Sequence, residues 1–389
     1  MPETEATQVQ NAEIGTQEAE AVATKTAADK VADAVSTASV RRAIERSREI
    51  EEQIALDPSQ FRMLTGARPT GNLHVGHYFG TLINWVGLQN RGVETWTLIA
   101  DYQVITDRDG VGPLKERVYG LVTDYLACGI DPEKTTIFTH SAVPALNQLM
   151  IPFLSLVTES ELNRNPTVKA ELEASGGRAL SGLLLTYPVH QATDILFCKA
   201  NIVPVGQDQL PHIELTRQIA SRFDRRYGRA EKDNPVFRRP DALLSEAPLI
   251  LGTDGEKMAK SRGNTIEIGF TADETAQVLK KAKTDSDRVI TYDPVNRPEV
   301  SNLLMLAALA SGGDPETIAA EIGGGGGGKL KAVVTEAVNE ALAPVRARRQ
   351  ELAADTTYIH EVLAAGNEKA NEEANRTLGE VRQAMAMIY

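Results

Sequence analysis

The chain has 389 residues, of which 42% are hydrophobic, 24% charged and 5% aromatic, enough apolar material for one large or two medium cores. Its formal net charge of -12 argues against a surface coated in basic charge for indiscriminate DNA binding. Cys128 and Cys198 are the two cysteines, and they lack the paired spacing of zinc ligands, so we expect no disulfide framework and no metal site. No stretch approaches the ~20 apolar residues that cross a bilayer, and no secretory signal is evident, which predicts a soluble, cytoplasmic protein without membrane contact.

Residues 1–58 differ from the rest of the chain and read as an N-terminal extension. Residues 1 to about 38 are mostly Ala, Glu, Thr, Gln and Val, with no aromatic residue. Such a tract cannot bury enough surface to offset its ordering entropy, so we expect it to be disordered. Between Ser39 and Leu56, apolar residues recur at near-helical spacing among mixed charges, which predicts one amphipathic helix.

Between residues 59 and 245, short strand-like runs alternate with helical patterns. The alternation predicts a parallel sheet with helices on both faces, that is, an α/β, Rossmann-like catalytic domain. Expected strands lie at 61–66, 95–105, 135–140 and 201–205, and expected helices at 78–92, 115–130 and 210–223.

After a linking region at 246–295, the strand patterns disappear. Residues 296–389 show helical patterns at 301–310, 330–353 and 370–388, which predicts a C-terminal helical domain. The six glycines at 323–328 indicate a flexible surface connection between two of these helices.

The strongest functional signal is Gly71-Asn72-Leu73-His74-Val75-Gly76-His77, which follows a predicted strand and opens a predicted helix. A helix start presents free N–H groups and the positive end of the helix dipole, so phosphate can bind there. Gly76 would let a nucleotide approach closely, and the imidazoles of His74 and His77 can donate hydrogen bonds to charge that develops on a phosphoryl group. Two ordinary surface histidines are the competing interpretation.

The second signal is the segment 253–264, in which Lys257 and Lys260 bracket Met258 and Ala259. Glycines near both ends would leave it mobile, and a mobile loop with two ammonium groups can close over a triphosphate and neutralise departing pyrophosphate. Alone, such a loop is usually a solvated turn. Its position after the histidine motif makes the pair far more specific.

Together the two segments resemble the HIGH and KMSKS signatures of class I aminoacyl-tRNA synthetases. The stretches between them, LLTYPVHQATDIL at 184–196 and VPVGQDQLPHIEL at 203–215, look like the tryptophanyl-tRNA synthetase family, and the resemblance runs from about Phe61 to the C-terminus. It implies ATP-dependent activation of tryptophan, transfer to tRNA(Trp), Mg²⁺ that travels with ATP, anticodon binding by residues 296–389, and a homodimer.

The resemblance also assigns site residues. Catalysis by positioning and charge stabilisation is assigned to His74, His77, Lys257 and Lys260. ATP-binding positions are Gly66, Arg68, Gly71, Asn72, Gly76, Lys169, Gly206, Asp208, Met258 and Ser261. Tryptophan-binding positions are Leu64, Gln103, Tyr187, Gln191, Asp194, Val203, Val205 and Gln209. Asp194 would accept the indole N–H, which discriminates strongly because a ligand without that donor leaves a buried polar group unpaired.

Five positions depart from the common bacterial type of this family. Leu64, Arg68, Gln103, Gln191 and Ala259 stand where that type has Phe, Gln, His, Met and Ser. The pocket is therefore more polar, and the chain looks closer to a divergent, auxiliary branch of the family. We expect tolerance for substituted indoles or resistance to inhibitors that mimic tryptophan.

Three other functions remain open at this point. A tyrosyl-tRNA synthetase shares the core, a small nucleotidyltransferase would share the histidine motif, and a non-catalytic paralogue could bind tryptophan as a sensor. A separate group of arginines between 217 and 239 either meets tRNA phosphates or forms a solvated helix face.

Overall fold

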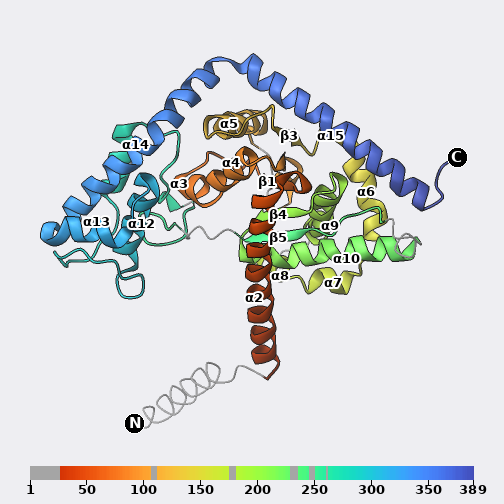
Figure 1. Cartoon of the computed structure of the whole chain (residues 1–389), viewed down its shortest axis with the longest axis horizontal. Helices are drawn as coiled ribbons and strands as arrows, with labels where there is room; N and C mark the ends of the chain where they lie inside the picture. The colour runs from red at the N-terminus through yellow and green to blue at the C-terminus, as the bar shows by residue number, and fades with distance from the viewer. Residues whose placement is uncertain (1–26, 107–111, 175–180, 228–234, 245–249, 260–261) are drawn as a thin grey trace, which may run out of the picture.

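The computed structural model describes residues 27–106, 112–174, 181–227, 235–244, 250–259 and 262–389. At its centre lies a five-stranded parallel sheet in the order β3-β2-β1-β4-β5 (Figure 1). The strands are β1 (Arg62–Ala67), β2 (Glu94–Ile99), β3 (Thr135–Thr139), β4 (Ile202–Val205) and β5 (Asp241–Leu244). The predicted α/β class is confirmed, although the second strand ends at Ile99 and β5 was not predicted.

Helices cover both faces of the sheet. Successive strand residues face opposite sides, so Met63 packs with Phe79, Leu82 and Trp85 in one core, whereas Leu64 packs in the other. The α-helices between β1 and β5 are α3 (Val75–His77), α4 (Ile83–Asn90), α5 (Leu114–Ala127), α6 (Pro144–Leu154), α7 (Glu159–Asn163), α8 (Pro166–Ala174), α9 (Gly182–Phe197) and α10 (Leu210–Arg226) in the described residues.

The helix of the N-terminal extension covers one edge of the sheet. α2 (Ala27–Leu56) packs against β5, and the Ser47 hydroxyl accepts a hydrogen bond of 2.9 Å from the Leu244 amide (Figure 1). It begins at Ala27 and not near Ser39, so the expectation of disorder is wrong for residues 27–38. This stretch contains five alanines, the residues with the highest helix propensity, and continues directly into the amphipathic helix. Residues 1–26 lie outside the described residues.

The opposite edge is covered by the last helix of the chain. α15 (Thr356–Ala384) runs along β3, where the Asn367 side chain accepts from the Thr139 amide at 2.9 Å. Gly366 makes this approach possible, since a Cβ there would lie 1.9 Å from the Ile137 carbonyl oxygen. The apolar residues of α15 from Ala370 to Val381 join the same core as Leu64, and those from Ile359 to Leu363 join the core of Met63, so this helix packs onto the sheet.

The remaining helices of the C-terminal region are α11 (Ala272–Lys280), α12 (Pro298–Ser311), α13 (Pro315–Ile322) and α14 (Gly326–Ala354). The expectation of a flexible connection at 323–328 is wrong: Gly323–Gly325 form a 3-10 turn and Gly326 begins α14. The Gly323 carbonyl accepts from the Ile290 amide and the Gly326 amide donates to Arg288. Gly323 and Gly326 have positive φ angles, 55° and 73°, which glycine adopts without steric cost, so glycine at these two positions permits the turn.

In the described part of the chain, no helix combines the length and the apolar character that crossing a membrane requires.

Candidate functional site

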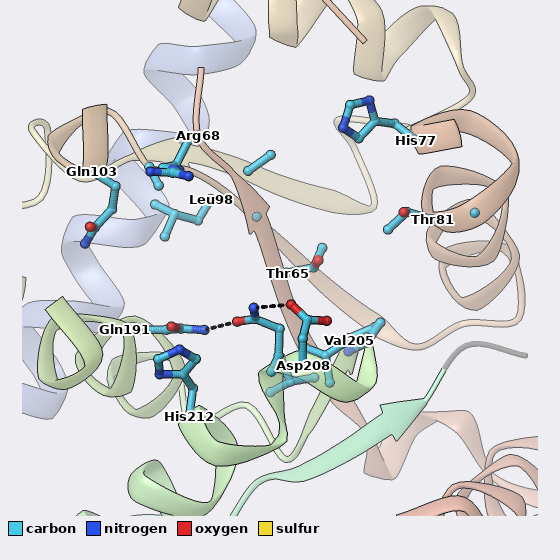
Figure 2. Close-up of a pocket in the computed structure, with 18 of the residues that line it drawn as sticks. Thr65, Arg68, His77, Thr81, Leu98, Gln103, Gln191, Val205, Asp208 and His212 are labelled. Carbon is cyan, nitrogen blue, oxygen red and sulfur yellow. Dashed lines mark hydrogen bonds between the residues drawn. The ribbon is translucent and has the colours of Figure 1, made fainter. Parts of the chain in front are cut away.

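A pocket of about 950 Å³ opens beyond the carboxyl ends of β1 and β4 (Figure 2). The connections leave β1 toward β2 on one side and reach β4 on the other, and open α/β sheets bind ligands at such a reversal. The predicted residues that line it are Leu64, Gly66, Arg68, His74, Gly76, His77, Gln103, Tyr187, Gln191, Asp194, Val203, Val205, Gly206, Asp208, Gln209, Lys257 and Met258.

Five predicted residues are not among these. Asn72 donates to Glu267 at 2.7 Å outside the pocket wall, and Gly71 precedes it. Lys169 is exposed on α8, although Thr167 on the same helix does line the pocket. Lys260 and Ser261 lie outside the described residues.

One end of the pocket, which we call the loop end, is built from residues 74–77 and 257–258. The rings of His74 and His77 lie 3.7 Å apart between centroids. The His74 amide donates to Nδ1 of His77 at 3.2 Å, so Nε2 carries the proton in the neutral ring. Gly76 makes room, because a Cβ there would lie 3.0 Å from the His74 ring.

The histidine segment is held by a neighbouring loop. Val75 donates its amide to Ile266 at 2.9 Å, and Ile268 donates to Leu73 at 3.0 Å. The sequence-based expectation of free amides at this helix start is therefore wrong for Val75. Long-range pairing with 266–268 takes that amide, and no local pattern predicts such pairing.

The described part of the lysine loop folds around Asn264. This buried side chain donates to Asp254 at 2.8 Å and to the Lys257 carbonyl at 3.1 Å, and it accepts from the Ala259 amide at 2.8 Å. A Cβ at Gly252 would lie 2.3 Å from the Asn264 side-chain nitrogen. Gly252 therefore permits close packing, whereas Gly263 has a positive φ of 64°, a conformation that suits glycine. The exposed Lys257 side chain is thus carried on an ordered turn.

A wide helical turn completes the loop end. Tyr78–Leu82 form a π-helical turn between α3 and α4, a feature often found at functional sites. It brings Gly80 and Thr81 into the pocket wall, where Figure 2 shows Thr81 beside His77. A π turn leaves no clear periodicity in a short sequence, and neither residue was predicted.

The other end, the α9 end, is dominated by one face of α9. Tyr187, Gln191 and Asp194 follow helical spacing, and all three line the pocket. Gln191 donates to Gln209 at 3.4 Å, and Gln209 donates to Asp208 at 2.8 Å, as the dashed lines in Figure 2 show. This chain of amides makes the pocket polar between α9 and β4.

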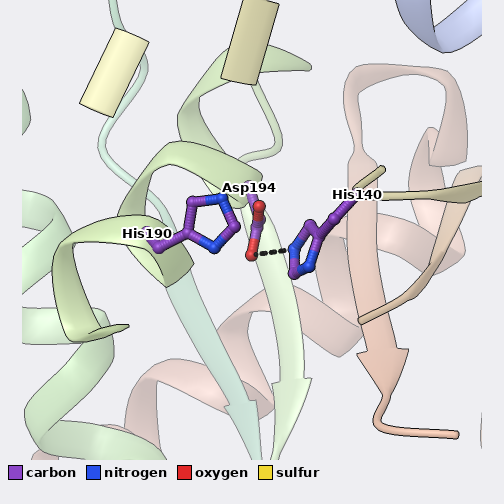
Figure 3. A group of neighbouring side chains, drawn as sticks. All are labelled: His140, His190 and Asp194. Atoms are coloured by element: carbon purple, nitrogen blue, oxygen red, sulfur yellow. Dashed lines mark ion pairs between the residues drawn. The ribbon is translucent and has the colours of Figure 1, made fainter. Parts of the chain in front are cut away.

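Asp194 lines the α9 end of the pocket, and two buried histidines, His140 and His190, lie next to it behind the pocket wall (Figure 3). Its Oδ2 lies 3.0 Å from Nε2 of His140, and Oδ1 has no hydrogen-bond partner among the described residues. His190 lies one turn before Asp194, and its Nδ1 is 3.1 Å from the Gln103 amide nitrogen. Burial, above all, lowers the pKa of His190, so its ring is neutral near pH 7.

His212 is a pocket residue that no site prediction included. It is buried on α10 and contacts the Tyr187 hydroxyl and the Asn165 side chain, at 3.5 and 3.4 Å. Burial lowers its pKa to about 4, so the ring is neutral under ordinary conditions. The sequence feature that could have identified His212 as a site residue is its position in the first turn of α10, three residues after the Gly206–Gln209 turn.

The arginine group on α10 is largely engaged in structural contacts. Arg217 pairs with Asp241, and Arg222 pairs with Glu161 on α7 and also donates to a backbone carbonyl. Arg226 donates to the Ser155 carbonyl at 3.2 Å. These contacts favour a role for these three side chains in stabilising the fold over a role in binding tRNA phosphates.

Comparison with known proteins gives consistent matches. The family model described as tRNA synthetases class I (W and Y) matches residues 57–343. The tryptophan–tRNA ligase of Thermotoga maritima is 40% identical over 339 residues, which cover 84% of this chain and 100% of the relative. The tryptophan–tRNA ligase of Clostridium longisporum is 40% identical over 337 residues, which cover 84% of this chain and 97% of the relative. The structure of tryptophanyl-tRNA synthetase from Campylobacter jejuni, complexed with ADP and tryptophan, matches with a TM-score of 0.72 and 30% identity, covering 84% of this chain and 99% of that chain.

Proposed function

This chain belongs to the class I tRNA synthetases of the tryptophan and tyrosine family, and we propose that its large pocket carries out the tryptophan–tRNA ligase reaction. The relatives from Thermotoga maritima, Clostridium longisporum and Nostoc, which are 38–40% identical over 83–84% of the chain, are tryptophan–tRNA ligases, and this favours that activity over a tyrosyl enzyme or a non-catalytic paralogue.

The two ends of the pocket divide the substrates between them. ATP binds at the loop end, where His74, His77 and Lys257 supply donors and positive charge for its phosphates. Tryptophan binds at the α9 end, between Tyr187, Gln191 and Asp194. The complex of the Campylobacter relative with ADP and tryptophan supports one nucleotide and one amino acid in such a pocket.

One observation carries the tryptophan assignment. Asp194 is a buried carboxylate that lines the pocket, and its Oδ1 has no hydrogen-bond partner among the described residues. An indole N–H supplies that partner, whereas the ring of phenylalanine offers none.

The chemistry then follows from positioning. A carboxylate oxygen of tryptophan bonds to the α-phosphorus of ATP while the bond from that phosphorus to the bridging oxygen breaks, releasing pyrophosphate. Donors on His74, His77 and Lys257 stabilise the charge that grows on the phosphate oxygens, and no side-chain nucleophile takes part. In the second step a hydroxyl of the 3′-terminal ribose of tRNA(Trp) attacks the activated carbonyl, and AMP leaves.

The remaining partners belong to the same proposal. Mg²⁺ enters with ATP, whose phosphates supply its preferred oxygen ligands. Residues 296–389 bind the anticodon region of tRNA, and the enzyme works in the cytoplasm as a homodimer. Ile105 and Ile151, with exposed fractions of 48% and 69%, offer apolar surface for the second copy. Light scattering should then give twice the 42.1 kDa of one chain.

Amino-acid-dependent ATP–pyrophosphate exchange with each of the twenty amino acids tests the function. We expect tryptophan alone to support rapid exchange. Exchange with tyrosine in place of tryptophan would show that the chain is a tyrosyl enzyme. Absence of exchange with every amino acid would indicate a non-catalytic protein that only binds its ligand.

A further inference from the structure

Next to the α9 end of the pocket, and reaching its wall through Asp194, lie three side chains whose ligand atoms converge (Figure 3). His140 directly follows β3, whereas His190 and Asp194 lie one turn apart on α9. Their ligand atoms all lie within 4.8 Å of one another, and all three residues are buried. The end of β3 and one face of α9 therefore place two imidazoles and a carboxylate around one point.

These groups are not satisfied by the protein around them. In the described part of the chain, neither nitrogen of His140, nor Nε2 of His190, nor Oδ1 of Asp194 has a hydrogen-bond partner. The 3.0 Å contact between His140 and Asp194 lacks hydrogen-bond geometry. Buried polar atoms normally have partners, so four such atoms together indicate a missing ligand. The indole N–H of tryptophan satisfies only one of them.

We propose that His140, His190 and Asp194 bind a divalent transition-metal ion, with Zn²⁺ as the ion that best fits two nitrogen donors and one oxygen donor. Imidazole nitrogen disfavours Mg²⁺ and Ca²⁺, which take oxygen ligands. Three protein ligands leave a fourth position open, as in other zinc sites with exchangeable ligands.

Gln103 supplies the outer support that such a site needs. A histidine that binds metal through Nε2 carries its proton on Nδ1 and donates it to an acceptor. Nδ1 of His190 lies 3.1 Å from the Gln103 amide, and turning that amide over presents its oxygen to the ring. The glutamine thus selects the tautomer that leaves Nε2 free for the metal.

A consequence for substrate binding rests on the proposed function. The metal takes Oδ1 of Asp194, and this is the atom that accepts the indole N–H. The metal and tryptophan therefore compete, and occupation of the site by zinc inhibits activation of the amino acid.

Titration of the metal-free full-length protein with Co²⁺ tests the site, because Co²⁺ substitutes for zinc and its visible absorption reports the ligands. We expect one Co²⁺ per chain, displaced by Zn²⁺. His140→Gln, His190→Gln and Asp194→Asn should each abolish the spectrum, and Gln103→Leu should weaken binding about 10–100-fold. Circular dichroism checks that each variant is folded.

Two further histidine variants locate the ion. His360 is exposed on α15, and His77 belongs to the other close pair of histidines, so His360→Gln and His77→Gln should both keep the spectrum. Loss of the spectrum in His77→Gln, its persistence in the three ligand variants, or no stoichiometric binding by the wild type would overturn the proposal. If a ligand variant fails to fold, the rise in melting temperature on addition of Zn²⁺ is compared between the wild type and Gln103→Leu. An equal rise in the two proteins would also overturn the proposal.

Addition of tryptophan separates this inference from the proposed function. We expect tryptophan to displace Co²⁺ from the wild type. Activation of tryptophan with the Co²⁺ spectrum intact would refute the competition. A Co²⁺ site in a chain that activates no tryptophan would instead refute the proposed function and leave the metal site standing.

Discussion

The two ends of the pocket are made in different ways. The loop end comes from two short segments, 74–77 and 257–258, and its His77 and Lys257 side chains are exposed. The α9 end is assembled from β1, β4, α9 and α10 and the turns beside them, and Asp194 and His212 are buried there. Charge stabilisation needs donors that reach a polar substrate, whereas recognition of an apolar ring needs a dry site in which each unpaired polar group has a cost.

The largest expected effect concerns Asp124, a buried carboxylate that supports the loop end. It accepts from Arg349 Nε at 2.6 Å and from the Leu73 amide at 3.4 Å, and its side chain is 2% exposed. Arg349→Met removes this ion pair from a buried carboxylate. We expect a loss of about 3–5 kcal/mol in the free energy of unfolding, measured by urea denaturation.

The neighbouring Arg348 is the matched control, since it makes only an exposed pair with Glu351 on the same helix. Arg348→Met should change the free energy of unfolding by less than about 1 kcal/mol. Equal effects of the two variants would mean that Asp124 does not anchor the loop end.

His77→Ala tests the loop end itself. The imidazole is predicted to act mainly on the transition state, so its removal should lower the rate of tryptophan activation about 10²–10³-fold, with little change in the KM for tryptophan. Pyrophosphate exchange measures both constants, and His360→Ala on α15 is the control. A rate within about threefold of the wild type would remove His77 from the mechanism.

Asp194→Ala tests the α9 end, where the expected effect is on recognition of tryptophan. Loss of a charge-assisted hydrogen bond should weaken kcat/KM for tryptophan by about 1.5–3 kcal/mol and leave the KM for ATP unchanged. Benzothienyl-alanine has sulfur in place of the indole N–H, so the wild type should reject it and the variant should discriminate much less. Equal activation of both amino acids by the wild type would show that Asp194 does not read the indole.

The smallest effect concerns His212 and pH. Its pKa is about 4 in the folded protein and about 6.5 when exposed, so the unfolded chain binds the extra proton as the pH falls below 6.5. Stability should therefore fall by about 2 kcal/mol between pH 7 and pH 5 through this residue. Urea denaturation at both pH values should show a smaller fall in His212→Gln, and an identical fall would mean that the ring is protonated in the fold.

The sequence by itself determined the α/β class and four of the five strands, and the family resemblance added seventeen of the residues that line the pocket. Strands and helices follow from the period of apolar residues, and the segment 71–77 follows from local order along the chain. For the same reason the loop end could be recognised from its motifs. At the α9 end the residues were assigned through a family resemblance, since their spacing alone left other interpretations open.

Only the tertiary structure decided which distant groups meet. The convergence of His140 with His190 and Asp194, the pairing of the histidine segment with residues 266–268, and the packing of α15 against β3 depend on residues far apart in the chain. The glycines at 323–328 looked flexible because composition carries no record of the backbone bonds from Arg288 and Ile290 that hold them. Local patterns record the propensity of a segment, whereas burial and partner choice arise from the free energy of the whole packed chain.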